Sequence, residues 1–142
     1  MVRVLATGTF DILHPGHLLY LTEAKKLGDE LYVIVARDAN VVHKPKPILP
    51  EKQRVEMVGS LKVVDKAILG DPKDKFRLVE EIKPDIIALG YDQHFRVREL
   101  EEELRARGID AKVVRIEASN PCPLCSSRAI IERILKVKGG ER

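Results

Sequence analysis

The sequence predicts an α/β protein built on a doubly wound, five-stranded parallel sheet. Short apolar runs alternate with segments of helical periodicity along all 142 residues. The apolar runs show no clean alternation of apolar and polar residues, which is typical of strands that are covered on both faces. The length suits a single domain whose core is large enough to fold without disulfides. Together these observations predict one domain with helices on both faces of the sheet.

Five apolar runs are predicted as strands, and the segments after them as helices. The strands are expected at 2–7, 31–36, 66–70, 85–90 and 111–116, and the helices at about 17–27, 51–60, 74–83, 97–107 and 127–137. Gly28, Pro84 and Gly108 stand where helices should end. Right-handed crossovers lead to strand order 3-2-1-4-5, with a ligand site between the carboxyl ends of the first and fourth strands. We expect the domain to span 1–138 and a flexible tail to occupy 139–142.

Composition limits the partners that the sequence supports. The chain is 44% hydrophobic and 33% charged, and its net charge of +3 is too small to indicate nucleic acid. No apolar run approaches the roughly 18 residues of a membrane span. Arg3 and Asp11 interrupt the first apolar run, so no secretory leader is expected. The composition therefore predicts a cytoplasmic protein and points to neither a nucleic-acid nor a membrane partner.

The ten residues GTFDILHPGH, 8–17, form the predicted turn between the first strand and the first helix. Such a turn offers unpaired backbone N–H groups and the positive end of a helix dipole, which favour phosphate. Pro15 suits the first helical turn, and His14 and His17 fall on one side of it, where both rings reach one phosphoryl group. Asp11 could orient a ring, bind magnesium or hold a substrate group. Two alternatives are a pair of surface histidines and a metal-binding pair.

GTFD followed by HPGH directly after the first strand resembles the cytidylyltransferase-like HxGH nucleotidyltransferase superfamily. The resemblance runs over essentially the whole chain and implies a Rossmann-like fold. It also implies that His14 and His17 contact the nucleotide phosphates and stabilise the transition state. The nucleotide contacts expected on this turn are Thr9, Phe10, Asp11, His14, Pro15, Gly16 and His17.

The loop HKPKP presents Lys44 and Lys46 on a proline-stiffened segment. These lysines are either a solvated basic loop or, as the superfamily resemblance implies, cations that hold the leaving phosphates. Arg54 matches a family position where arginine is common, and a phosphate contact is expected there. A second loop, GYDQHF, places Asp92 at the far side of the switch point, where it is expected to contact the nucleoside. His94 and Phe95 flank a base or flavin ring in one interpretation and are packing residues in the other.

The segment NPCPLCSSR is predicted to start the last helix. Ser126 and Ser127 suit an N-cap, and Arg128 adds a bidentate cation for phosphate oxygens. In the superfamily this position binds the phosphates from the side opposite the HxGH helix. Cys122 and Cys125 supply half of a zinc site at most, and in a cytoplasmic chain we expect thiols rather than a structural disulfide. A reversible disulfide, a reactive thiolate and simple packing remain open for the pair.

Several segments are similar to the archaeal FAD synthetase branch of the superfamily. They are GTFDILHPGH, VARD, PILPEKQR, VDKAILG and the cysteines before the last helix. This resemblance implies transfer of AMP from ATP to FMN with a divalent cation, Mg²⁺, that enters with ATP. It also implies a homodimer, and no metal site made of protein side chains is expected. One alternative is a cytidylyltransferase acting on glycerol 3-phosphate or another small phosphate. A second, from another class, is a non-catalytic nucleotide-binding redox sensor. The choice of base and acceptor rests on the resemblance alone.

Overall fold

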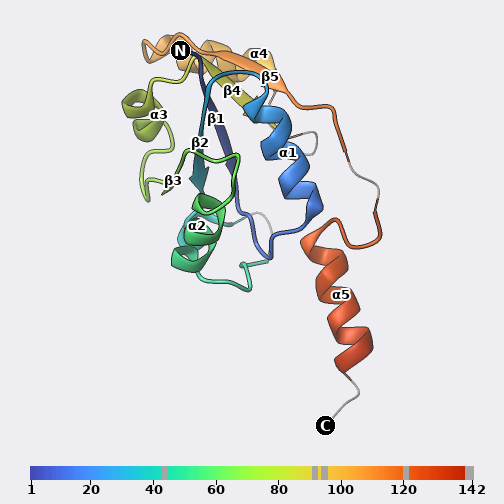
Figure 1. Cartoon of the computed structure of the whole chain (residues 1–142). Coiled ribbons are helices and arrows are strands. Elements are labelled where there is room, and N and C mark those ends of the chain that lie inside the picture. Colours follow the sequence, from blue (N-terminus) through green and yellow to red (C-terminus); the bar gives the residue numbers. More distant parts are fainter. Residues whose placement is uncertain (43–44, 91–92, 94–95, 120–121, 140–142) are drawn as a thin grey trace.

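The computed structural model describes residues 1–42, 45–90, 93, 96–119 and 122–139. Its centre is a five-stranded, all-parallel sheet of order β3-β2-β1-β4-β5, as the sequence predicts (Figure 1). The strands are β1 (Arg3–Gly8), β2 (Glu30–Val35), β3 (Lys66–Leu69), β4 (Ile86–Leu89) and β5 (Lys112–Arg115). The helices are α1 (Pro15–Lys25), α2 (Glu51–Gly59), α3 (Arg77–Ile82), α4 (Val97–Ala106) and α5 (Ser127–Lys138), with a short 3₁₀ turn η1 (Asp38–Asn40).

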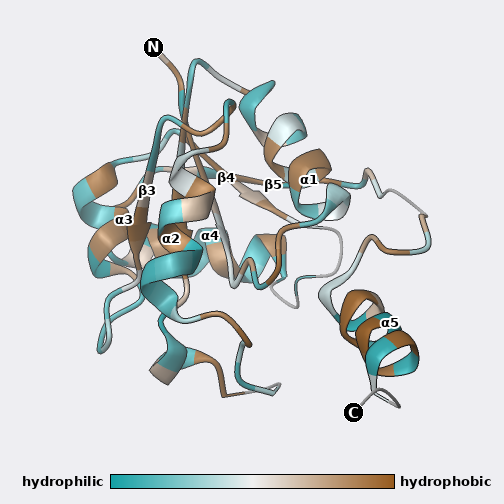
Figure 2. Cartoon of the chain, turned by 60° about the horizontal axis from the view of Figure 1, so that its bottom comes forward, coloured by the Kyte–Doolittle hydropathy of each residue, from teal (hydrophilic) through white to brown (hydrophobic). Residues whose placement is uncertain are grey.

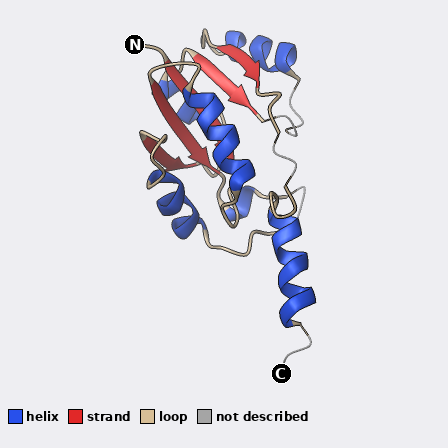
Figure 3. Ribbon diagram, turned by 45° about the vertical axis from the view of Figure 1, so that its right-hand side comes forward, coloured by secondary structure: helices blue, strands red, loops and turns tan. Residues whose placement is uncertain are grey.

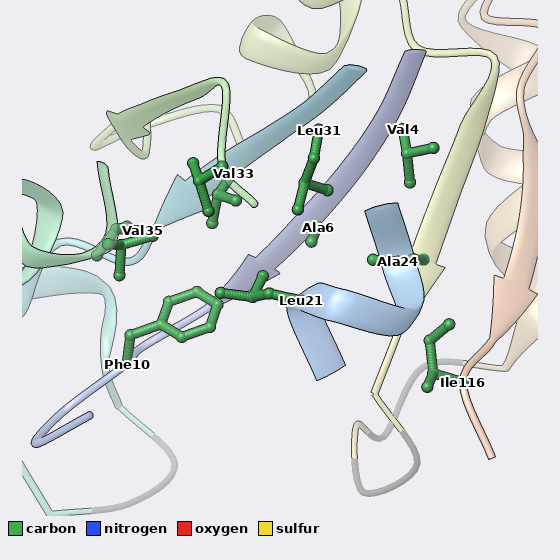
Figure 4. Close-up of a cluster of buried hydrophobic side chains, with 12 residues drawn as sticks. Val4, Ala6, Phe10, Leu21, Ala24, Leu31, Val33, Val35 and Ile116 are labelled. Atoms are coloured by element: carbon green, nitrogen blue, oxygen red, sulfur yellow. The ribbon is translucent and has the colours of Figure 1, made fainter. Parts of the chain in front are cut away.

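Helices lie on both faces of the sheet (Figure 3), and each face carries its own hydrophobic cluster. The first joins β1 and β2 to α1 and α2, and Val4 and Ala6 of β1 point into it (Figure 4). The second joins the sheet to α3 and α4, and Leu5 of β1 belongs to it. Because successive strand residues point to opposite faces, both sides of β1 are covered by helices. The doubly wound arrangement predicted from the sequence is confirmed.

Two helices start at other residues than predicted. Helix α1 begins at Pro15, two residues early, because His14 already serves as its N-cap. Helix α3 begins at Arg77 rather than near 74, because the carboxylates of Asp71 and Asp74 accept backbone N–H groups of the preceding loop. At the end of α4, Gly108 adopts the left-handed φ of 78° that a helix-terminating glycine favours, as predicted.

Helix α5 stands apart from the sheet, and none of its residues is buried (Figures 1 and 2). Its aliphatic residues include Ile134 and Leu135, whose exposed fractions are 51% and 65%. The predicted tail beyond 139 lies outside the described residues, and the proposed 1–138 domain boundary stays a prediction. Within the described ranges, no helix has the length and apolar character needed to cross a membrane.

Candidate active site

The carboxyl ends of β1 and β4 diverge at the predicted switch point, and Tyr20 of α1 joins them there. Strand pairing between β1 and β4 ends at Ala6 and Ala88. The Tyr20 hydroxyl accepts a hydrogen bond from the Thr7 N–H at 3.2 Å and donates one to the Ala88 carbonyl at 2.6 Å. It thereby satisfies backbone groups that the separating strands leave unpaired. Tyr20 was not identified from the sequence, although a tyrosine hydroxyl on the core-facing side of α1 needs a hydrogen-bond partner.

The loop after β4 is fastened to the same place. The Gln93 amide N–H donates to the Thr7 carbonyl at 3.2 Å, and the Gly90 N–H donates to Gln93 Oε1 at 2.7 Å. From β5, Arg115 donates to the carbonyls of Gly90 and Gln93 at 2.9 and 2.8 Å. Neither Gln93 nor Arg115 was identified from the sequence. The three expected residues of this loop, Asp92, His94 and Phe95, lie outside the described residues.

His14 and His17 form a reciprocal cap at the start of α1. His14 Nδ1 accepts the N–H groups of Gly16 and His17 at 3.1 and 3.4 Å, and His17 Nδ1 accepts the His14 N–H at 3.3 Å. Their rings stack with centroids 3.7 Å apart. Because each Nδ1 accepts a hydrogen bond, the proton of each neutral ring sits on Nε2. The helix start therefore carries two Nε2–H donors held close together, the groups that a phosphoryl oxygen needs.

Phe10 supports the histidine pair from the core side. Its ring is 4% exposed, packs into the α1 cluster and meets the His17 ring edge-on at 5.3 Å (Figure 4). Phe10 and Ile12 have positive φ angles of 56° and 51°, which residues other than glycine rarely adopt. Because the Phe10 side chain is buried, the nucleotide contact expected from it can come only from its backbone.

Asp11 connects the turn between β1 and α1 to the loop that follows η1. Its two carboxylate oxygens accept the N–H groups of Ile48 and Leu49 at 2.8 and 3.0 Å. In the same loop, the Lys46 ammonium donates to the Asp38 carbonyl at 2.8 Å. Lys44 lies outside the described residues. In this structure the Asp11 carboxylate holds a protein loop. These contacts are none of the three roles expected for it, which were to orient a ring, to bind magnesium and to hold a substrate group.

Arg54 differs from its expected role. The sequence suggests a phosphate contact, but the residue is 1% exposed and its guanidinium donates to protein oxygens. They include the carbonyls of Thr9 and Leu49, at 2.7 and 2.9 Å, and Asp38 Oδ1 at 2.6 Å. The hydrogen bond from Arg54 holds the pKa of the Asp38 carboxyl below its usual value. A buried guanidinium with these partners does not reach a phosphate in this conformation.

The start of α5 lies against the turn that leads into α1. The Ser127 hydroxyl donates to the Asp11 carbonyl, and Ser126 caps α5 by accepting the Ala129 N–H at 3.0 Å. A Cβ on Gly16 would lie 2.8 Å from the Cys125 carbonyl, so the two segments approach as closely as glycine permits. The Arg128 side chain is 90% exposed and pairs with Glu132 at 3.2 Å.

Cys122 and Cys125 are joined by a disulfide, with their Cα atoms 5.3 Å apart. The expectation of two thiols is therefore wrong for this structure. The Cys125 N–H donates to the Cys122 carbonyl at 3.4 Å, and this turn brings the two cysteines together. The next residue, Ser126, is the N-cap of α5. Because the sulfurs are bonded to each other, they are also not the half zinc site considered from the spacing.

Two concavities of the surface lie away from the predicted site residues. One concavity of about 600 Å³ lies at the β3–α3 loop beside η1 and α4, and another of about 490 Å³ lies near Pro84 and Gly108. Among the residues that the structure describes, no three His, Cys, Asp or Glu side chains gather in a metal-binding group.

Comparison with known proteins agrees with this geometry. The model of a family described as cytidylyltransferase-like matches residues 5–133. An FAD synthase of Methanosarcina acetivorans is 65% identical over 139 residues, covering 98% of this chain and 92% of its own. One of Archaeoglobus profundus is 67% identical over 137 residues, 96% of this chain and 88% of its own.

Among solved structures, a lipopolysaccharide core biosynthesis protein from Thermoplasma volcanium is 52% identical. It superposes with a TM-score of 0.82 over 84% of this chain and 99% of its own. A pantoate-beta-alanine ligase from Francisella tularensis has a TM-score of 0.61 at 16% identity, over 93% of this chain and 64% of its own, and shows the shared fold alone.

Proposed function

Because the chain belongs to the cytidylyltransferase-like family, we propose that it is an FAD synthase, which transfers AMP from ATP to FMN and releases pyrophosphate. One observation carries the reaction class: the rings of His14 and His17 stack at the start of α1, and the start of α5 is hydrogen-bonded to the same turn. High identity to curated FAD synthases over nearly the full chain supports ATP and FMN as the substrates.

In the proposed reaction, a phosphate oxygen of FMN attacks the α-phosphorus of ATP. A new P–O bond forms as the bond to the pyrophosphate oxygen breaks, and pyrophosphate leaves with that electron pair. The nucleophile belongs to the substrate, so the protein needs no serine or cysteine nucleophile. His14 and His17 donate Nε2–H hydrogen bonds to the charge that grows on the α-phosphate oxygens. Donors already in place lower the barrier because they need no reorientation during the reaction.

The remaining contacts that we propose surround this centre. Lys44, Lys46 and the α5 start, with Ser126, Ser127 and Arg128, hold the leaving pyrophosphate. Thr9, Asp11, Pro15 and Gly16 line the nucleotide side of the turn, and Asp92 contacts the nucleoside. A divalent cation, Mg²⁺ in our proposal, enters with ATP and neutralises charge on the triphosphate. The homodimer and the cytoplasmic location expected from the sequence are proposed with it.

The disulfide favours a second candidate, a nucleotide-binding redox sensor, because it closes a loop that leads into the α5 cap. A protein that only binds nucleotide has no need of paired donors for a developing charge, so we favour the enzyme. A cytidylyltransferase with a small phosphate acceptor remains the alternative within enzymes.

A pyrophosphate-release screen separates these functions. The protein is incubated under reducing conditions with ATP or CTP and each of FMN, glycerol 3-phosphate and pantetheine phosphate. We expect release from ATP with FMN, and FAD as the product identified by chromatography. Release from CTP with glycerol 3-phosphate alone contradicts the proposal. ATP binding without pyrophosphate release from any acceptor supports the sensor.

A further inference from the structure

Arg54 is, within the described ranges, the one charged side chain that is fully buried. A buried charge is costly unless it is paired and its donors are hydrogen-bonded. Arg54 meets both conditions, since Asp38 pairs with it and three backbone carbonyls accept its remaining hydrogen bonds. Where those carbonyls lie indicates what the residue does for the reaction.

Two of the carbonyls stand just past the ends of neighbouring strands. Strand pairing between β1 and β2 ends at Gly8 and Val35, and the next residues carry the acceptors. Arg54 Nη1 donates to the Thr9 carbonyl at 2.7 Å and to the Ala36 carbonyl at 2.8 Å. Arg54 Nη1 thus connects the segments that follow β1 and β2, at the point where both leave the sheet.

The third carbonyl, that of Leu49, closes a ring of contacts around the 9–12 turn between β1 and α1. Arg54 Nε donates to the Leu49 carbonyl at 2.9 Å, and the Leu49 N–H donates to the Asp11 carboxylate at 3.0 Å. The ring therefore runs from Thr9 through Arg54 and Leu49 to Asp11. It encloses Phe10, whose φ of 56° is unfavourable unless the surroundings impose it.

The fourth partner, Asp38, belongs to the stem of the lysine-bearing loop. The Asp38 N–H donates to Glu51 at 2.9 Å, and the Glu51 N–H donates back to Asp38 at 3.3 Å. These reciprocal bonds close the 38–51 segment, and Arg54 connects its stem to the turn that leads to His14.

We infer that Arg54 is a positioning residue of the nucleotidyl transfer, which sets the backbone of the 9–12 turn against the 38–51 loop without contacting phosphate. The inference rests on the proposed function. A lysine at this position keeps the charge, but its single ammonium group lacks the planar fork that serves Thr9, Ala36, Leu49 and Asp38 together. The turn of Arg54→Lys should then relax, and the histidines should move relative to bound ATP.

The test is steady-state kinetics of FAD formation by Arg54→Lys beside the control Lys52→Met, which removes an exposed charge from the same helix. For Arg54→Lys we expect kcat to fall by about 10- to 100-fold, the effect of a misplacement of about 1 Å. The KM for ATP should stay within about twofold, since no phosphate contact is lost. Lys52→Met should match the wild type. An unchanged kcat overturns the inference, and so does a tenfold rise of KM for ATP at constant kcat, which indicates a direct phosphate contact.

A second variant and a second readout cover poor folding of Arg54→Lys. Asp38→Asn alters a side chain that is 42% exposed and should lower kcat in the same way, by a smaller factor. In both variants, NMR spectra of the folded protein should show shifted imidazole resonances for His14 and His17. Imidazole spectra identical to the wild type in a folded variant overturn the inference even if the wild type forms no FAD. Absence of FAD with the wild type counts against the proposed function alone.

Discussion

The two helix starts that meet at the candidate active site are held in different ways. Helix α1 is capped by imidazole rings, and Leu21 and Ala24 anchor it in the core. Helix α5 has a serine cap and no buried residue, and its start is tied to the turn through Ser127 and the close approach of Cys125 to Gly16. The donors proposed for the reacting phosphate thus stand on a helix that is anchored in the core, whereas the proposed second half of the site stands on a helix with no buried residue. We therefore expect changes at α1 to alter turnover and changes at α5 to alter ATP affinity.

The largest effect should come from His17→Ala. Removing one of the two Nε2–H donors should lower kcat by about 100- to 1,000-fold, as loss of a single preorganised donor does elsewhere. The circular dichroism spectrum should stay that of the wild type, because α1 keeps its buried residues. Leu18→Ala, at the next and 44% exposed position, is the control and should keep its turnover. Unchanged turnover in His17→Ala would contradict the transition-state role.

Gly16→Ala disturbs both helix starts at once. The added methyl group would lie 2.8 Å from the Cys125 carbonyl and 2.9 Å from the His14 ring, so one of them must move. We expect kcat to fall by about tenfold or more, since small misplacements in an active site are costly. Gly59→Ala is the matched control, because its Cβ would meet only the Ala67 side chain at 3.5 Å. Equal activity of the two variants would show that the close approach is not needed.

Ser127→Ala affects the α5 half alone. It removes the hydrogen bond to the Asp11 carbonyl, and the KM for ATP should rise about fivefold, corresponding to about 1 kcal/mol for one hydrogen bond. Turnover at saturating ATP should change little. Ser60→Ala, which removes a hydroxyl bonded within its own helix, is the control. A fall in kcat with unchanged KM would instead place Ser127 with the histidines.

The smallest effect on activity should come from Asp71→Asn, far from both helix starts along the chain. Hydrogen bonds from the N–H groups of Asp74 and Lys73 lower the pKa of the Asp71 carboxyl from 3.8 to about 2. A lowered pKa means that the ionised form stabilises the fold above pH 3.8 and that this stabilisation is lost as the pH falls through 2. The Tm of the wild type should therefore exceed that of Asp71→Asn at neutral pH and converge with it near pH 2. At neutral pH, Asp71→Asn and the wild type should form FAD at the same rate. A lower rate in Asp71→Asn would contradict the expectation that this loop acts on stability and not on activity.

The sequence predicts the fold well because its signals are local. Apolar runs, helix-ending glycines and the HPGH turn act within a few residues, so strand order and the start of α1 follow from pattern. The proximity of α5 to the first turn was expected from the family resemblance, and in the structure the Ser127 contact joins the two segments. Tyr20, Gln93 and Arg115 were not found, because each bonds to backbone groups distant in sequence whose positions depend on the assembled sheet.

By itself, the sequence determined the α/β class and the strand order, since residue types and spacing carry those signals, and it indicated the reaction class through the family resemblance of the HPGH turn. The tertiary structure decided three further points. It buried Arg54 among strand-end carbonyls, turned the Phe10 ring into the core and joined the two cysteines. The physical reason is that burial and hydrogen-bond partners depend on which distant segments share a volume. Arg54, for which the family resemblance suggested a phosphate contact, thus donates to three backbone carbonyls and to Asp38 of its own chain.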